Sequence, residues 1–157
     1  MEGKKLIETL FSSVIGKYPR VKPGYANFIT LDFGKDITKK VKKKTGEEHV
    51  FHFGEWHLWV YICGWRIDVN GKPFVACEDT EEVTDNGISV LNSKKLINFR
   101  VLNPAFDSIL EFESGYELKL FSCWTVDGEH WMFFTPNKKV FAAGPGKNWS
   151  YDYSNKP

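Results

Sequence analysis

Two histidines separated by a short glycine-containing stretch are the residues best suited to binding a metal. His52 and His57 flank Gly54 and Glu55, a pair that suits the loop of a tight β-hairpin. In such a hairpin the two histidines lie opposite each other on neighbouring strands, close enough to share one metal ion. A zinc site needs three or four ligands. The pattern therefore predicts either a metal site or an ordinary cross-strand pair on the surface.

Five carboxylates cluster in the middle of the chain. They are Glu78, Asp79, Glu81, Glu82 and Asp85. Such a cluster attracts a basic partner and speeds its association. It lacks the alternating acidic pattern and the central glycine of a calcium-binding EF-hand loop. We interpret residues 80–94 as an acidic linker, which is either a solvated connection or a surface that binds a basic protein.

No nucleophile has a suitable partner on its own strand, so another histidine could approach Cys63 only through tertiary folding. Cys63 shares an expected strand face with His57, but six residues of strand separate the two by about 20 Å, too far for a nucleophile and its base. The three cysteines also lack the close spacing of a zinc or redox motif. These patterns indicate a non-catalytic protein without a cofactor.

Charge and hydropathy argue against nucleic acid and membrane as partners. The chain has 21 basic and 20 acidic residues, a formal net charge of +1. One basic run stands out, with no aromatic residue or glycine-rich loop within it. It consists of Lys39, Lys40, Lys42, Lys43 and Lys44. We expect a solvated strand end there, and, since no secretory or membrane-spanning run is present, a cytoplasmic protein.

The elements that must position these groups begin with a helix over residues 1–16. Apolar side chains recur there at helical spacing, and Gly16 and Pro19 are typical helix-ending residues. The apolar positions are Leu6, Ile7, Leu10, Phe11, Val14 and Ile15. This stripe must be buried against another part of the protein.

The remainder of the chain contains a β-rich unit twice. At an offset of sixty residues one strand pattern recurs, and the likeness resumes after a further shift of six. Trp56, Leu58, Val60, Tyr61 and Cys63 fall on Tyr116, Leu118, Leu120, Phe121 and Cys123, and then Trp65 falls on Trp131. We expect a first β unit over residues 36–79, a second over 95–146 and a frayed tail over 150–157.

These patterns predict a single α+β domain spanning residues 1–157. We expect the N-terminal helix to pack on an antiparallel β sandwich or bent sheet made of the two pseudo-repeated β units. Alternation along the first unit places Trp59 and Tyr61 on an aromatic face that needs a cover. That cover is either the N-terminal helix or a partner.

A set of spaced residues carries a family resemblance. They are Trp65-Arg66-Ile67, Glu78-Asp79, Lys95-Leu96-Ile97, Asp107, Leu110, Phe112, Gly115, Leu118, Leu120, Trp131 and Gly144-Pro145-Gly146. Over residues 56–149 the chain resembles a loose group of small, largely uncharacterised bacterial β-rich proteins, although Lys94 stands where that group favours glycine. Some members look like immunity proteins of toxin systems, so the resemblance implies protein binding. We expect Arg66 to pair with Glu78 or Asp79 across a hairpin.

We therefore predict a non-catalytic protein-binding module, an immunity-type inhibitor of a bacterial toxin. The expected contact residues are Trp59, Tyr61, Arg66, Glu78, Asp79, Glu81, Glu82 and Asp85. The alternative is a small-molecule or metal-binding protein that uses a cleft between the two β units. That cleft would be lined by His52, His57, Arg66 and His130. A homodimer that shares the helix stripe or the aromatic face is a third alternative.

Overall fold

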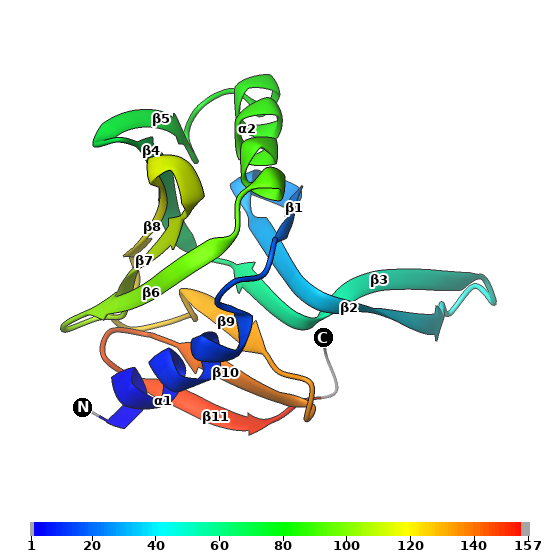
Figure 1. Ribbon diagram of the computed structural model, residues 1–157. Coiled ribbons are helices and arrows are strands. Elements are labelled where there is room, and N and C mark those ends of the chain that lie inside the picture. The colour runs from blue at the N-terminus through cyan, green and yellow to red at the C-terminus, as the bar shows by residue number, and fades with distance from the viewer. Residues whose placement is uncertain (1, 155–157) are drawn as a thin grey trace.

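The protein is built from two antiparallel sheets and two α-helices in the part of the chain that the structure describes, residues 2–154 (Figure 1). The predicted α+β class is confirmed in this computed structural model. Sheet A has six strands in the order β1-β2-β3-β9-β10-β11, and sheet B has five in the order β5-β4-β8-β7-β6.

The elements have the following bounds. Sheet A contains β1 (Arg20–Pro23), β2 (Ile29–Lys42), β3 (Glu48–Val60), β9 (Trp131–Phe134), β10 (Lys139–Ala143) and β11 (Trp149–Tyr153). Sheet B contains β4 (Cys63–Val69), β5 (Lys72–Ala76), β6 (Leu96–Leu102), β7 (Asp107–Phe112) and β8 (Tyr116–Ser122). The α-helices are α1 (Glu2–Phe11) and α2 (Glu81–Ile88), and short 3-10 helices are η1 (Ser12–Val14), η2 (Tyr25–Asn27), η3 (Ser89–Ser93) and η4 (Glu113–Gly115).

The N-terminal helix predicted from the apolar spacing is confirmed as α1 followed by η1. Its buried stripe contains Ile7, Phe11 and Val14, all fully buried. The Phe11 ring stacks on Phe99 of β6 at 3.7 Å between centroids and on Phe133 of β9 at 4.1 Å. One helical side chain therefore joins the two sheets, and α1 covers the inner face of sheet A.

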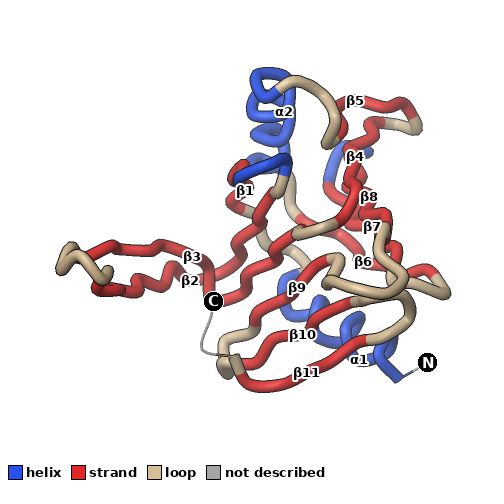
Figure 2. Tube along the Cα trace, turned by 180° about the vertical axis from the view of Figure 1, so that it is seen from behind, coloured by secondary structure: helices blue, strands red, loops and turns tan. Residues whose placement is uncertain are grey.

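Strands β2 and β3 are much longer than their neighbours, and their outer halves leave the body as a two-stranded ribbon (Figures 1 and 2). We call residues 36–54 the β2–β3 arm. The turn at its tip is closed by hydrogen bonds between Lys43 and Glu47 and between Gly46 and Lys43. The predicted hairpin at Gly54 and Glu55 is therefore wrong, because both residues lie within β3.

Gly54 serves close packing instead of a turn. The register between β2 and β3 shifts between Phe33 and Asp36, opposite this glycine. A β-carbon at position 54 would lie only 2.8 Å from the backbone nitrogen and oxygen of Phe33. Glycine within a strand pattern is typical of such a bulge or close backbone approach. The arm leaves the sheet at this point.

Residues 80–94, predicted as an acidic linker, form α2 and η3. The helix rests on β1 and β5 through a buried face of small and apolar residues that includes Thr84, Gly87 and Ile88. Gly87 lies directly against Val75 of β5, where an added β-carbon would approach the valine side chain to 2.9 Å. The linker prediction is wrong because a short polar segment gains its stability from this tertiary contact.

The predicted frayed tail is also wrong as far as Tyr153. Residues 149–153 form β11, which pairs with β10 at the edge of sheet A. The Trp149 ring stacks on Phe141 at 5.5 Å between centroids, and its indole also lies against Gly3 of α1. The last part of that prediction, residues 155–157, lies outside the described residues.

Candidate functional site

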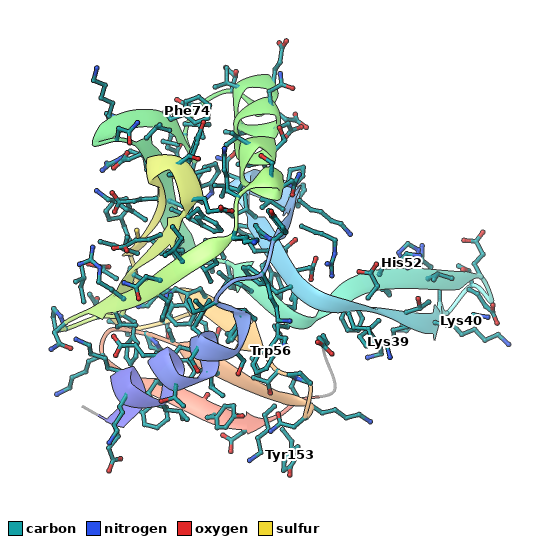
Figure 3. The ribbon with its side chains drawn as sticks, in the orientation of Figure 1. Lys39, Lys40, His52, Trp56, Phe74 and Tyr153 are labelled. Atoms are coloured by element: carbon teal, nitrogen blue, oxygen red, sulfur yellow. The ribbon has the colours of Figure 1, made fainter. Side chains whose placement is uncertain are left out.

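The two histidines predicted to face each other lie on the same strand. His52 is exposed on the arm, where it pairs with Thr38, whereas His57 lies in the body of sheet A and pairs with Asp32. Figure 3 shows His52 on the opposite side of the arm from Lys39. The shared His52–His57 site is therefore wrong. No group of three or more potential metal ligands occurs among residues 2–154.

His57 instead forms a largely buried hydrogen-bonded pair with Asp32. Its Nδ1 lies 2.5 Å from Asp32 Oδ1, which also accepts a hydrogen bond from the Gly54 backbone N–H at 2.8 Å. The Asp32 side chain is 2% exposed. Burial alone would raise the pKa of Asp32, but the hydrogen bonds and positive charge of its partners hold that pKa below its usual value. The pair links β2 to β3 where the strand bends.

Trp59 and Tyr61 lie on the outer face of sheet A, away from α1. The centroids of the Trp59 and Tyr61 rings are 4.7 Å apart, and those of the Phe28 and Tyr61 rings are 5.1 Å apart. All three side chains are half-buried. We call Phe28, Trp59 and Tyr61 the open-face aromatic cluster. The expectation that the N-terminal helix covers this face is wrong, because α1 packs against Phe133 on the inner face.

The predicted acidic residues gather around α2. Glu81, Glu82 and Asp85 are exposed on the helix, and Glu78 and Asp79 are exposed just before it. Asp79 accepts a hydrogen bond from the Ala76 backbone N–H at 2.8 Å. The five carboxylates are therefore carried by α2 and the residues just before it, at one end of the molecule (Figure 1).

Arg66 does not pair with Glu78 or Asp79 as predicted. Its guanidinium donates to both carboxylate oxygens of Asp68, at 2.6 and 3.1 Å, on the outer face of sheet B. Lys119 Nζ lies 3.0 Å from the same carboxylate. The Arg66 hydrogen bond is the main cause that lowers the pKa of Asp68, against the opposing effect of burial, and Lys119 adds to it. Arg66 thus belongs to a three-residue ion network.

A pocket of about 700 Å³ lies where the arm leaves sheet A. Its walls come from β2, from β3 and from the turn between β9 and β10. They include four lysines and two phenylalanines. These residues are Lys35, Lys39, Lys138, Lys139, Phe53 and Phe134. His57, Arg66, His52 and His130, which the sequence suggested as the lining of a cleft, are not among the lining residues.

Neither Cys63 nor His130 is available for surface chemistry. Burial raises the pKa of the Cys63 thiol, and its Sγ lies 3.2 Å from the Phe121 carbonyl oxygen. His130 is fully buried, and its Nδ1 has no hydrogen-bond partner among the described residues. Burial lowers the pKa of His130, so the imidazole is held neutral in the folded protein.

This buried histidine predicts a loss of stability at mildly acid pH. Because the folded-state pKa of His130 lies below the unfolded value of about 6.5, the unfolded chain binds more protons below that pH. We expect the free energy of unfolding to fall by up to about 1.4 kcal/mol per pH unit below pH 6.5. Urea unfolding at pH 7.5 and 5.5 measures this, with His130→Gln expected to reduce the pH dependence. An exposed control, His49→Gln, should keep it, and equal pH dependence in all three proteins would contradict the prediction.

Sequence reasoning missed Asp32 and three of the four pocket lysines, and it assigned the fourth, Lys39, only to a solvated strand end. Asp32 stands between the apolar residues Leu31 and Phe33, a position that strand alternation turns towards solvent. Its burial follows from the approach of Gly54 and His57 from the neighbouring strand. The only signal was an acidic residue inside an otherwise apolar strand, which is a weak one.

No helix within residues 2–154 has both the length and the hydropathy to cross a membrane. Searches against protein-family models, curated proteins and solved structures found no match to this chain.

Proposed function

We propose that this protein is a non-catalytic protein-binding module that inhibits a basic partner, as an immunity protein inhibits a bacterial toxin. The observation that carries the proposal is the open-face aromatic cluster. The Tyr61 ring contacts both Phe28 and Trp59 on a sheet face that α1 leaves open. Half-buried aromatic side chains of this kind supply most of the affinity at protein interfaces.

The acidic helix supports the choice of a basic partner. The carboxylates around α2 are exposed, and none of the five has an ion-pair partner recorded among the described residues. Exposed charge of one sign speeds the encounter with a partner of opposite charge and does so most strongly at low salt. The aromatic cluster would then hold the partner after encounter.

A charge-reversal experiment tests the role of α2. We expect Glu81→Lys with Glu82→Lys to slow association with the partner at least about tenfold at low ionic strength. The partner is first isolated by affinity purification from the native host, and the rates are measured by surface plasmon resonance. The matched control is Glu47→Lys with Glu48→Lys, an exposed acidic pair on the arm. Equal slowing by both double variants would remove α2 from the proposal.

A second pair of variants tests the aromatic cluster in the same assay. Trp59→Ala should speed dissociation, whereas Tyr153→Ala, which removes a 78% exposed ring from β11, should leave it unchanged. Co-expression of the isolated partner in a bacterial host then tests inhibition. Growth should be restored by the wild-type protein and not by Trp59→Ala. A partner that is harmless to the host would keep the binding role and contradict the inhibitory one.

We also infer that residues 36–79 and 95–146 are pseudo-equivalent units that exchange strands in a sandwich-like arrangement. Support comes from the strand order. The β2–β3 pair of the first unit lies beside β9–β10 of the second in sheet A, and β7–β8 of the second lies beside β4–β5 of the first in sheet B. Each unit thus gives its earlier pair to one sheet and its later pair to the other.

A second candidate function is small-molecule binding at the junction of these units. The observation that favours it is the pocket at the base of the arm, which takes its walls from β2 and β3 on one side and from the β9–β10 turn on the other. A volume of about 700 Å³ falls within the usual range for ligand sites.

A further inference from the structure

The pocket at the base of the arm has a positively charged rim. Lys35 and Lys138 are exposed and Lys139 is half-buried, and all three line it. Glu55 is the only carboxylate among the described lining residues. Asp36, at the start of the arm, is paired with Arg20 at 2.9 Å. The charge that a ligand would meet is therefore mainly positive.

The local structure differs at two of these lysines. The Lys139 ammonium lies over the rings of Tyr151 and Tyr153, at 5.1 and 5.0 Å from their centroids. Lys138 has φ of 62°, a left-handed conformation that glycine or asparagine adopts at lower cost. Glycine would adopt this backbone conformation without strain, so the lysine at this position can be replaced by glycine without a steric cost.

Two phenylalanines contribute to the walls of the pocket. Phe53 of β3 and Phe134 of β9 both line it, and both contact the ring of His57, at 6.4 and 5.6 Å between centroids. Because Asp32 binds His57, the His57 ring supports the two phenylalanines from behind without lining the pocket itself. Figure 3 shows Lys39 on the side of the arm that faces the β10–β11 end of the sheet.

We propose that this pocket binds a small aromatic anion, a flat ring that carries a phosphate or a carboxylate. The ring would pack on Phe53 and Phe134, and the anionic group would meet Lys35, Lys138 and Lys139. Ammonium groups bind phosphate and carboxylate through charge-assisted hydrogen bonds, which are about twice as strong as neutral ones. The inference rests on the second function proposed above and is independent of the aromatic cluster and α2.

Three related probes test the two halves of this chemistry. Adenosine monophosphate supplies both ring and phosphate, adenosine only the ring, and inorganic phosphate only the anion. Isothermal titration calorimetry on the full chain should show adenosine monophosphate binding at least about tenfold more tightly than either fragment. If adenosine bound as tightly as adenosine monophosphate, the proposed recognition of the anionic group would be wrong, although the pocket would still bind small molecules. Equal binding of inorganic phosphate would overturn the aromatic part, and no binding of any probe at millimolar concentration would overturn the site itself.

A turn variant separates ligand binding from folding. Lys138→Gly removes the ammonium and also relieves the left-handed backbone, so the melting temperature should stay the same or rise. Affinity for adenosine monophosphate should nevertheless fall about tenfold. The control is Lys147→Gly, which removes an exposed lysine from a loop outside the pocket. Unchanged affinity in Lys138→Gly, or an equal loss in the control, would contradict the proposal.

Discussion

Replacing Phe11 with alanine is expected to lower the free energy of unfolding by about 4 kcal/mol. The ring is fully buried and stacks on Phe99 of sheet B and Phe133 of sheet A. Its removal leaves a cavity where α1 and both sheets meet, and stacked aromatic pairs add to the loss from burial alone. Urea unfolding followed by tryptophan fluorescence measures the change.

The comparison variant is Phe51→Ala, which makes the same substitution on the arm at a side chain that is 44% exposed. We expect it to cost less than about 1 kcal/mol, because much of that ring already contacts water. A cost below about 1 kcal/mol for Phe11→Ala would show that α1 is not held to the sheets by this contact.

The second large effect concerns Asp32. Asp32→Ala should destabilise the protein by about 3 kcal/mol at pH 7, because it leaves His57 and the Gly54 backbone N–H without their buried acceptor. Asp32→Asn removes the charge but keeps an oxygen acceptor. It should therefore cost less than the alanine variant. Urea unfolding at pH 7 provides both values.

The pH dependence gives an independent measure of the same pair. Because the folded-state pKa of Asp32 lies below its unfolded value of about 3.9, its stabilisation is present above that pH and is lost as the pH falls through the folded-state pKa. Asp32→Asn should reduce this acid sensitivity, while Asp68 maintains part of it. The control is Asp152→Asn at an exposed position. An acid transition that is identical in wild type and Asp32→Asn would contradict this account.

The parts of the fold that sequence reasoning obtained correctly depend on local periodicity. The apolar positions 7, 11 and 14 follow the helical repeat closely, and the structure buries all three on one face. Strand alternation sets Leu58 on the face opposite Trp59, and the structure buries Leu58 fully, as it does the matching Leu118 of the second unit. When one face of a helix or strand is buried, the apolar residues recur at that element's period. This spacing is visible in a single sequence.

The parts that failed depend on contacts between distant segments. Gly54 was interpreted as a turn residue, although its function is to admit the backbone of Phe33. Helix α2 has a short apolar face that packs on Val75, and this residue belongs to strand β5. Strand β11 exists because β10 pairs with it. The conformational propensities of neighbouring residues do not show which distant segments will pack against them.

The candidate site shows the same division. The types and spacing of Trp59, Tyr61 and the acidic residues suggested a contact surface, but they did not reveal which elements support these side chains. The pocket was missed because Lys35 and Lys138 are about one hundred residues apart in the chain and meet only through the pairing of β3 with β9. The sequence around one charged residue does not indicate which distant charged residue will lie beside it in the fold.

The order of strands in the two sheets also determines when this protein can assemble during synthesis. Strand β3 receives its neighbour β9 only after residue 134 has been made, and β4 receives β8 only after residue 122. Until then each presents an open hydrogen-bonding edge, the feature that makes nascent strands prone to association. Pairing between segments so far apart also requires closure of long loops. Strands β1, β2 and β3 can pair with one another as soon as they are made, and so can β4 and β5, but β3 and β4 each keep one open edge until the strands of the second half emerge.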